Sequence, residues 1–206
     1  MLFWKENKLI DEFGFDEFDR PCKELYAMHL AFIVRERSID KSTKCGCVIT
    51  DQEGAILSTG YNNPVMGAID KNMPREKEET DRYVVYEHAE RSAIYMAARN
   101  GTALRGSIFY ISGLPCGDCL RGVIMTGASK LIYGPNTARM TDEAYISKYH
   151  LILSGQSLIV QNFKYTKGLY KLMPGLEEEM NGRPFIESSR LYKNSGFIKY
   201  GYKSPK

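Results

Sequence analysis

Two short motifs carry the side chains that could do chemistry. His88 and Glu90 stand two residues apart, and 25 residues after Glu90 a proline opens the segment that holds Cys116 and Cys119. Catalytic zinc sites take three protein ligands and leave the fourth position to a water molecule, whose pKa the metal lowers. One histidine, two cysteines and one spare carboxylate therefore predict a zinc site that activates water.

The spacing within each motif suits the start of a helix. Both thiolates, from Cys116 and Cys119, can reach one ion from a first helical turn, where the dipole and the free N–H groups stabilise thiolate. Glu90 would share the first turn of another helix with His88 and point beside the metal without binding it. That placement suits a base that takes a proton from the water and passes it to a leaving nitrogen.

Other interpretations exist for each motif alone. A C-x-x-C pair also occurs in redox sites and in structural zinc sites. A structural site would need a fourth Cys or His. We expect Cys45 and Cys47 to be small core residues that face opposite sides of a strand. The remaining candidates form no second close pair that matches the first motif: Cys22, Cys45, Cys47, His29 and His150.

The composition indicates a cytoplasmic enzyme. A chain of 206 residues with 43% hydrophobic and 26% charged residues is long enough for one domain with a full core. No apolar run approaches the roughly 18 residues of a membrane span, and we see no secretory segment. Five scattered cysteines favour reduced thiols over disulfides. The net charge of +3 does not demand a nucleic-acid partner, although it tolerates a phosphorylated substrate.

The hydrophobic pattern along the chain predicts an α/β protein in which both motifs lie at strand-to-helix turns. We expect a hairpin closed by Gly54, and little core beyond Pro174. The expected helices span residues 22–37, 88–100, 119–126 and 145–153, and the expected strands span residues 45–50, 55–61, 107–111, 130–133 and 157–163.

Two charged segments fall outside this pattern. Residues 71–82 are dense in charge and contain no Cys or His, so we expect a solvated excursion without a second zinc. Residues 192–206 interleave tyrosine and phenylalanine with lysine, which is typical of an arm for phosphate or single-stranded nucleic acid. A tail that packs on its own subunit or on a neighbour is the more common alternative.

Between residues 26 and 133 the sequence resembles the deoxycytidylate (dCMP) deaminase family of the cytidine deaminase superfamily, with residues 97–101 closest to viral and phage members. H-x-E followed by P-C-x-x-C is the signature of the zinc nucleobase deaminases. His88 is unlike the Cys of plain cytidine deaminases, and residues 37–40 differ from the transfer-RNA adenosine deaminases. The segments that carry the resemblance are residues 37–40 with 44–48, 58–64, 88–101 and 115–127.

The resemblance implies a three-layer α-β-α fold, with a mixed central sheet of about five strands flanked by helices. It places the zinc-binding deaminase domain at residues 21–170, between an amino-terminal extension of residues 1–20 and a carboxy-terminal extension of residues 171–206. One zinc ion per subunit and a homo-oligomer, commonly a hexamer, are also implied.

The resemblance further implies roles at the substrate. Glu90 would shuttle protons to the base N3 and to the departing ammonia, the N–H of Ala89 would hold the cytosine O2, and Pro115 would line the substrate site. Asn62 would bind the sugar hydroxyl, although an Asn that forms a turn is equally natural there.

The nucleotide's phosphate and a regulatory site have weaker candidates. Ser38 and Lys44 match a segment near the nucleotide phosphate, with a solvated surface pair as the alternative. Arg99 and Asn63 are candidates for an effector site, although Arg99 could equally be a partner of the helix dipole.

The expected reaction is zinc-dependent hydrolysis of dCMP to dUMP and ammonia, feeding thymidylate synthesis, with dCTP as activator and dTTP as inhibitor. This chain departs from the family at Ser92, where Asn is usual, at Asn63, where Gly is usual, and at Thr137, where a Tyr caps the substrate. Tyr145 is the substitute we consider for that cap. The departures leave dCMP and dCTP both open as substrates. The alternatives are a nucleobase deaminase acting on RNA or DNA, and a catalytically silent nucleotide-binding regulator.

Overall fold

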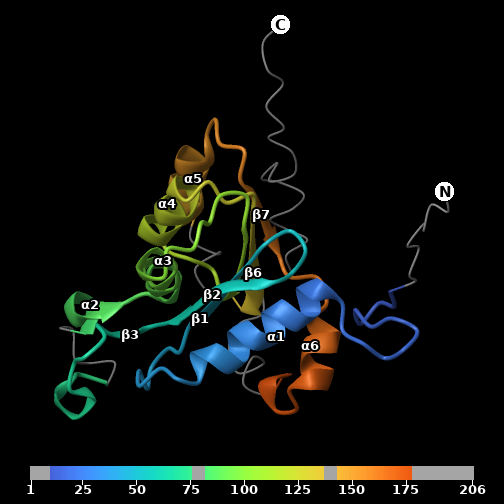
Figure 1. Cartoon of the computed structure of the whole chain (residues 1–206), viewed down its shortest axis with the longest axis horizontal. Helices are drawn as coiled ribbons and strands as arrows, with labels where there is room; N and C mark the ends of the chain where they lie inside the picture. The colour runs from blue at the N-terminus through green and yellow to red at the C-terminus, as the bar shows by residue number, and fades with distance from the viewer. Residues whose placement is uncertain (1–9, 76–81, 137–142, 178–206) are drawn as a thin grey trace, which may run out of the picture.

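The centre of the molecule is a mixed five-stranded sheet with the order β2-β1-β5-β6-β7 (Figure 1). The computed structural model describes residues 10–75, 82–136 and 143–177. β1 is antiparallel to β2 and β5, whereas β5, β6 and β7 run parallel. The strands are β1 Gly46–Thr50, β2 Ile56–Tyr61, β5 Ile108–Gly113, β6 Lys130–Asn136 and β7 Ile159–Asn162.

Helices cover both faces of this sheet, so the expected three-layer α-β-α architecture is confirmed. α1 (Lys23–Arg35) and α6 (Thr166–Leu172) pack on one face. α3 (Ala89–Arg99), α4 (Gly117–Met125) and α5 (Glu143–Leu153) pack on the other (Figure 1).

Side chains alternate between two cores along each central strand, as the period of two in a β-strand requires. On β1, Val48 belongs to the core under α1, while Cys47 and Ile49 belong to the core under α3. On β6, Ile132 and Leu131 divide in the same way. The sheet therefore has two buried faces.

The ends of two elements follow the chemistry expected from the sequence. The β1–β2 hairpin turns at Gly54, whose φ of 93° is accessible mainly to glycine, and Asp51 Oδ1 accepts a hydrogen bond of 2.8 Å from the Ala55 N–H. α3 ends at Asn100, and Gly101 follows with a φ of 68°, as in a glycine-terminated helix.

The prediction for Cys45 and Cys47 was wrong about their faces. Both side chains contact the core under α3: Cys47 is fully buried there and Cys45 packs at its edge. Residues two apart on a strand point to the same side, so these two cannot face opposite sides. Their assignment as core residues is consistent with this burial.

The segment before the first motif contains short elements that the pattern did not predict. β3 (Asn63–Pro64) and β4 (Tyr86–Glu87) form a two-stranded sheet, with the 3-10 turn η1 (Asp70–Asn72) and the short helix α2 (Arg82–Val85) between them. Runs of two residues are too short to show a hydrophobic period. β4 is important here because it leads directly into His88.

The ends of the described chain add to the core under α1. Phe15 and Leu176 are both about 4% exposed and pack there, and Leu176 is the one buried residue of the described residues 174–177. The proposed limit between residues 170 and 171 lies inside α6. Trp4, Thr137 and the arm at residues 192–206 lie outside the described residues.

Within the described ranges, no helix has both the length and the apolar character needed to cross a membrane.

Candidate metal centre

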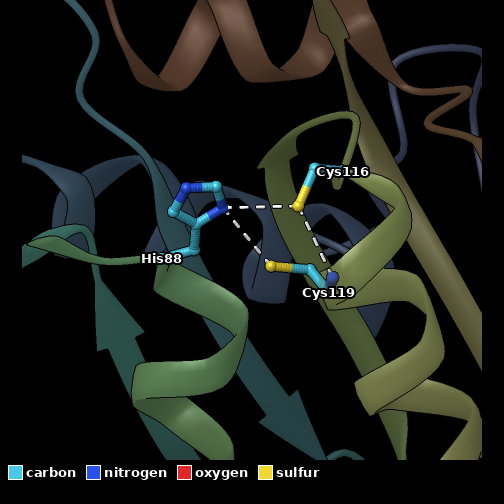
Figure 2. Close-up of side chains that lie close together, drawn as sticks. All are labelled: His88, Cys116 and Cys119. Atoms are coloured by element: carbon cyan, nitrogen blue, oxygen red, sulfur yellow. Dashed lines mark hydrogen bonds between the residues drawn. The ribbon is translucent and has the colours of Figure 1, made fainter. Parts of the chain in front are cut away.

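The three predicted metal ligands meet at the amino-terminal ends of two helices. His88 is the N-cap residue of α3 and follows β4, and Cys116 is the N-cap residue of α4 and follows β5. His88 Nδ1 lies 3.5 Å from Cys116 Sγ and 3.4 Å from Cys119 Sγ (Figure 2). Two motifs that are distant in sequence therefore form one cluster.

The geometry of this cluster fits zinc. Tetrahedral coordination with Zn–S of about 2.3 Å and Zn–N of about 2.0–2.1 Å places nitrogen and sulfur ligands about 3.6 Å apart. The two nitrogen–sulfur distances, 3.5 and 3.4 Å, are close to that value. Residues 10–75, 82–136 and 143–177 contain no second cluster of three such side chains.

Hydrogen bonds within the cluster prepare one thiolate. The bonds from Cys119 and then from His88 hold the pKa of Cys116 at about 3. The Cys119 N–H also donates to Cys116 Sγ, at 3.5 Å. The hydrogen bond to Cys116 raises the pKa of Cys119 and the pKa of His88, so in the absence of metal both groups hold their protons more tightly than the free side chains do.

Glu90 lies beside the ligands without joining them. Glu90 is 3% exposed, and this burial raises the pKa of its carboxyl group. Its charge interacts with those of His88 and Cys116, and the Cys119 thiol hydrogen-bonds to it. A buried carboxyl group with a raised pKa is well matched to both accepting and donating a proton near neutral pH.

A close approach between β2 and α3 sets the position of this helix. A Cβ atom at Gly60 would overlap the backbone of Ala89 and Ala93, so only glycine allows the two backbones to lie this close. Ala89 and Ala93 are both fully buried. Asn62 follows Gly60 by two residues, and the next residue, Asn63, pairs with Glu87, which directly precedes His88.

Residues 22–135 match the family model of the cytidine and deoxycytidylate deaminase zinc-binding region. The chain belongs to this family. The match includes all three metal ligands and Glu90, and the predicted zinc cofactor agrees with it.

Curated relatives in the family carry a more specific name. The deoxycytidylate deaminase of Enterobacteria phage T4 is 31% identical, over 52% of this chain and 74% of the relative. The human deoxycytidylate deaminase is 28% identical, over 63% of this chain and 74% of the relative. A dCMP deaminase from cyanophage S-TIM5, solved in complex with dCMP and dUMP, is 26% identical with a TM-score of 0.53, covering 67% of this chain and 95% of that chain.

In this deaminase, two residues predicted to bind substrate, Asn62 and Ser38, make hydrogen bonds with the loop that follows α1. Asn62 is 8% exposed; its Oδ1 accepts from the Cys45 N–H at 2.6 Å, and its Nδ2 donates to the Thr43 carbonyl at 2.8 Å. Ser38 is buried, and its hydroxyl accepts from the Asp40 N–H at 3.2 Å.

Lys44 and Pro115 also have partners within the protein. Lys44 Nζ lies 2.8 Å from Glu36 Oε2 in an exposed ion pair, and this hydrogen bond lowers the pKa of Glu36. The Pro115 carbonyl accepts from the hydroxyl of Tyr149, a buried residue of α5. α5 thus braces the loop that carries Cys116.

The two effector candidates are connected only through the loop that follows Asn63, since Asn63 pairs with Glu87 before α3 begins and Arg99 is the last residue of α3. Arg99, near the end of α3, hydrogen-bonds to Met66, which follows Asn63 by three residues. Among the described residues, Asn63 Oδ1 is a buried acceptor that has no hydrogen-bond partner.

Glu87 and Arg91 were missed by the sequence analysis. Glu87 Oε1 lies 2.5 Å from Arg91 Nε and accepts from the His88 N–H at 3.0 Å. An acid and a base four residues apart at a helix start were a visible signal, although such pairs are common on helix surfaces.

Proposed function

We propose that this protein catalyses the hydrolytic deamination of dCMP to dUMP and ammonia. The observation that carries the proposal is the meeting of three zinc-type ligands with the buried carboxyl group of Glu90 at two helix starts. The choice of dCMP is supported by the named activity of the relatives and by the cyanophage enzyme solved with dCMP and dUMP.

Bound zinc would be held by His88, Cys116 and Cys119 and would supply the Lewis acidity that activates water for attack on C4 of cytosine. Glu90 would accept a proton from that water and donate it to N3 of the base. It would then take the second proton from the new C4 hydroxyl group and donate it to the departing amine, which leaves as ammonia. The raised pKa of Glu90 makes its protonated form accessible during this sequence.

The start of α3 would also orient the base. Ala89 is the first residue of the helix, where backbone N–H groups have no partner inside the helix. Its N–H would therefore be free to donate to the cytosine O2. This contact would fix the base in the plane in which C4 faces the metal centre.

The sugar and phosphate would meet the loop after α1. Asn62 uses one acceptor site and one N–H on the protein, so its amide keeps one of each for a sugar hydroxyl. Ser38 accepts one hydrogen bond and can donate its own hydroxyl proton to a phosphate. Lys44 would have to exchange Glu36 for the phosphate, so we assign it the smaller contribution.

We further infer that dCTP and dTTP regulate the enzyme, with Arg99 and Asn63 as contacts in a homo-oligomer. Support comes from the proximity of Arg99 to the loop after Asn63 and from the unpaired acceptor of Asn63 among the described residues. Exchange of Arg99 for Ala would abolish the response to either nucleotide while leaving unregulated turnover in place. Retention of both responses would contradict this role.

Ammonia release by the zinc-loaded protein tests the main proposal. The protein is offered dCMP, dCTP and cytidine, each with and without added dCTP or dTTP as effector. Glu90→Gln serves as the inactive control. We expect turnover of dCMP, raised by dCTP and lowered by dTTP. No turnover of any of the three would contradict the proposal and favour a polymer substrate or a nucleotide-binding regulator.

A further inference from the structure

Glu87 makes two contacts at the junction that presents the histidine ligand. It is the last residue of β4 and directly precedes His88. Its Oε1 accepts hydrogen bonds from the His88 N–H at 3.0 Å and from Arg91 Nε at 2.5 Å. One carboxylate oxygen is thus shared between the backbone of a metal ligand and a side chain one turn further along α3.

The environment of this pair differs from that of an ordinary surface pair. The side chains of Glu87 and Arg91 are 24% and 29% exposed, whereas those of Asp118 and Arg121, the corresponding pair on α4, are 64% and 60% exposed. Ion pairs as exposed as the latter contribute little because water competes for both partners. The partly buried pair can therefore restrain the backbone between β4 and α3 more strongly.

Arg91 is also close enough to the ligands to act on them electrostatically. Its charge interacts with those of Cys119 and Cys116. A cation beside two thiolates stabilises the charge that zinc ligation requires. The Glu87 carboxylate holds this cation in place, so backbone restraint and electrostatic support come from one arrangement.

We propose that Glu87 and Arg91 are positioning residues for the metal centre: they hold the His88 backbone and a balancing positive charge so that the ligands are preorganised for zinc. Outer partners of metal ligands typically contribute about ten- to a hundredfold to metal affinity. This inference concerns metal binding alone and does not depend on which nucleotide is the substrate.

The test measures zinc affinity by competition with a chromophoric chelator, together with the absorption spectrum of the cobalt-substituted protein. Glu87→Leu removes both contacts, Glu87→Gln keeps an acceptor for the His88 N–H, and Arg91→Gln removes only the cation. We expect Glu87→Leu to lose at least about tenfold in affinity and to change the cobalt spectrum. Glu87→Gln and Arg91→Gln should lie between it and the wild type.

Arg121→Gln is the matched control, because it breaks the exposed ion pair with Asp118 on the other metal helix. It should leave zinc affinity and the cobalt spectrum unchanged. Wild-type affinity in Glu87→Leu, or an equal loss in Arg121→Gln, would overturn the proposal. If Glu87→Leu does not fold, the two milder variants decide, and wild-type values in both would overturn it.

Discussion

The two faces of the sheet are packed in different ways. Under α3 the contact is made by small residues: Ala89 and Ala93 lie against Gly60, with backbone close to backbone. Under α1 a similar close approach occurs at Gly46, but it is accompanied by large buried side chains of the helix, and Leu25, Met28 and Phe32 are all fully buried. The α3 face carries the metal centre. Among the described residues, the α1 face contributes no ligand to it.

The two kinds of packing have different effects: one fixes the position of a helix, and the other contributes free energy of folding. Burying a large side chain stabilises a fold by about 1.5–3 kcal/mol, so the α1 face contributes much of the free energy of folding. Alanine and glycine contribute less, but they leave no flexible side chain between the two backbones. The position of α3 relative to the sheet, and with it the position of His88, is therefore determined closely.

The largest effect should come from Glu90→Gln, which removes the proton-transfer group on the α3 face of the sheet. We expect turnover of dCMP to fall by about a thousandfold, because an amide cannot accept and return a proton as a carboxylate does. Zinc content and the free energy of unfolding should stay near wild type, since glutamine has nearly the same shape. The rate of ammonia release measures this loss. Turnover close to wild type would contradict the role of Glu90 in proton transfer.

Phe32→Ala probes the opposite face. Removing this fully buried ring should lower the free energy of unfolding by about 3–5 kcal/mol through lost burial and a cavity. Urea unfolding of the zinc-loaded protein measures the loss. Zinc content and turnover per folded molecule should not change, and a parallel loss of zinc affinity would show that the two faces are not separable.

Acid should weaken the metal centre. In the metal-free protein the pKa of His88 and that of Cys119 are raised, so both groups hold their protons more tightly, while Cys116 is already a thiolate. Zinc must displace the protons of the first two, so its affinity should fall by about tenfold to a hundredfold per pH unit, a factor of ten for each proton displaced. Chelator competition between pH 6 and pH 7 measures the slope; an affinity independent of pH would contradict these protonation states.

A pair of glycine substitutions sharpens the comparison with the smallest expected effects. Gly60→Ala would push β2 away from α3, whereas Gly46→Ala would push β1 away from the backbone of Ala31 and Arg35 on α1. Each should cost about 1–3 kcal/mol in the free energy of unfolding, as overpacking does. Only Gly60→Ala should also lower zinc affinity, and equal effects of both on zinc would show that α3 is not specially positioned.

Residues close together along the chain were the most predictable part of the site. Cys116 and Cys119 lie within one helical turn, as do His88 and Glu90, so the closeness of the two residues in each pair followed from helix geometry. The main helices and central strands also followed from their hydrophobic periods. Cys45 and Cys47 show the opposite case, where a misapplied strand period gave the wrong face.

Contacts between distant segments could not be predicted in this way. Asn62 forms hydrogen bonds with Thr43 and Cys45, and Tyr149 forms one with Pro115. These partners are too far apart along the sequence for a spacing rule within one helix or strand to predict them. The bonds of Glu87 were within reach of a spacing rule, but only the structure shows that its oxygen is shared with the His88 backbone.

The sequence by itself determined which chemical groups this deaminase has, because ligand type and spacing within one helical turn are properties of the chain. Only the tertiary structure decided that His88 Nδ1 and the two sulfur atoms lie 3.4 and 3.5 Å apart. That separation depends on how β2 packs against α3 and on how α3 packs beside α4. The reason is physical: rotation within a turn is set by the backbone, whereas distances between elements are set by the side chains that fill the space between them.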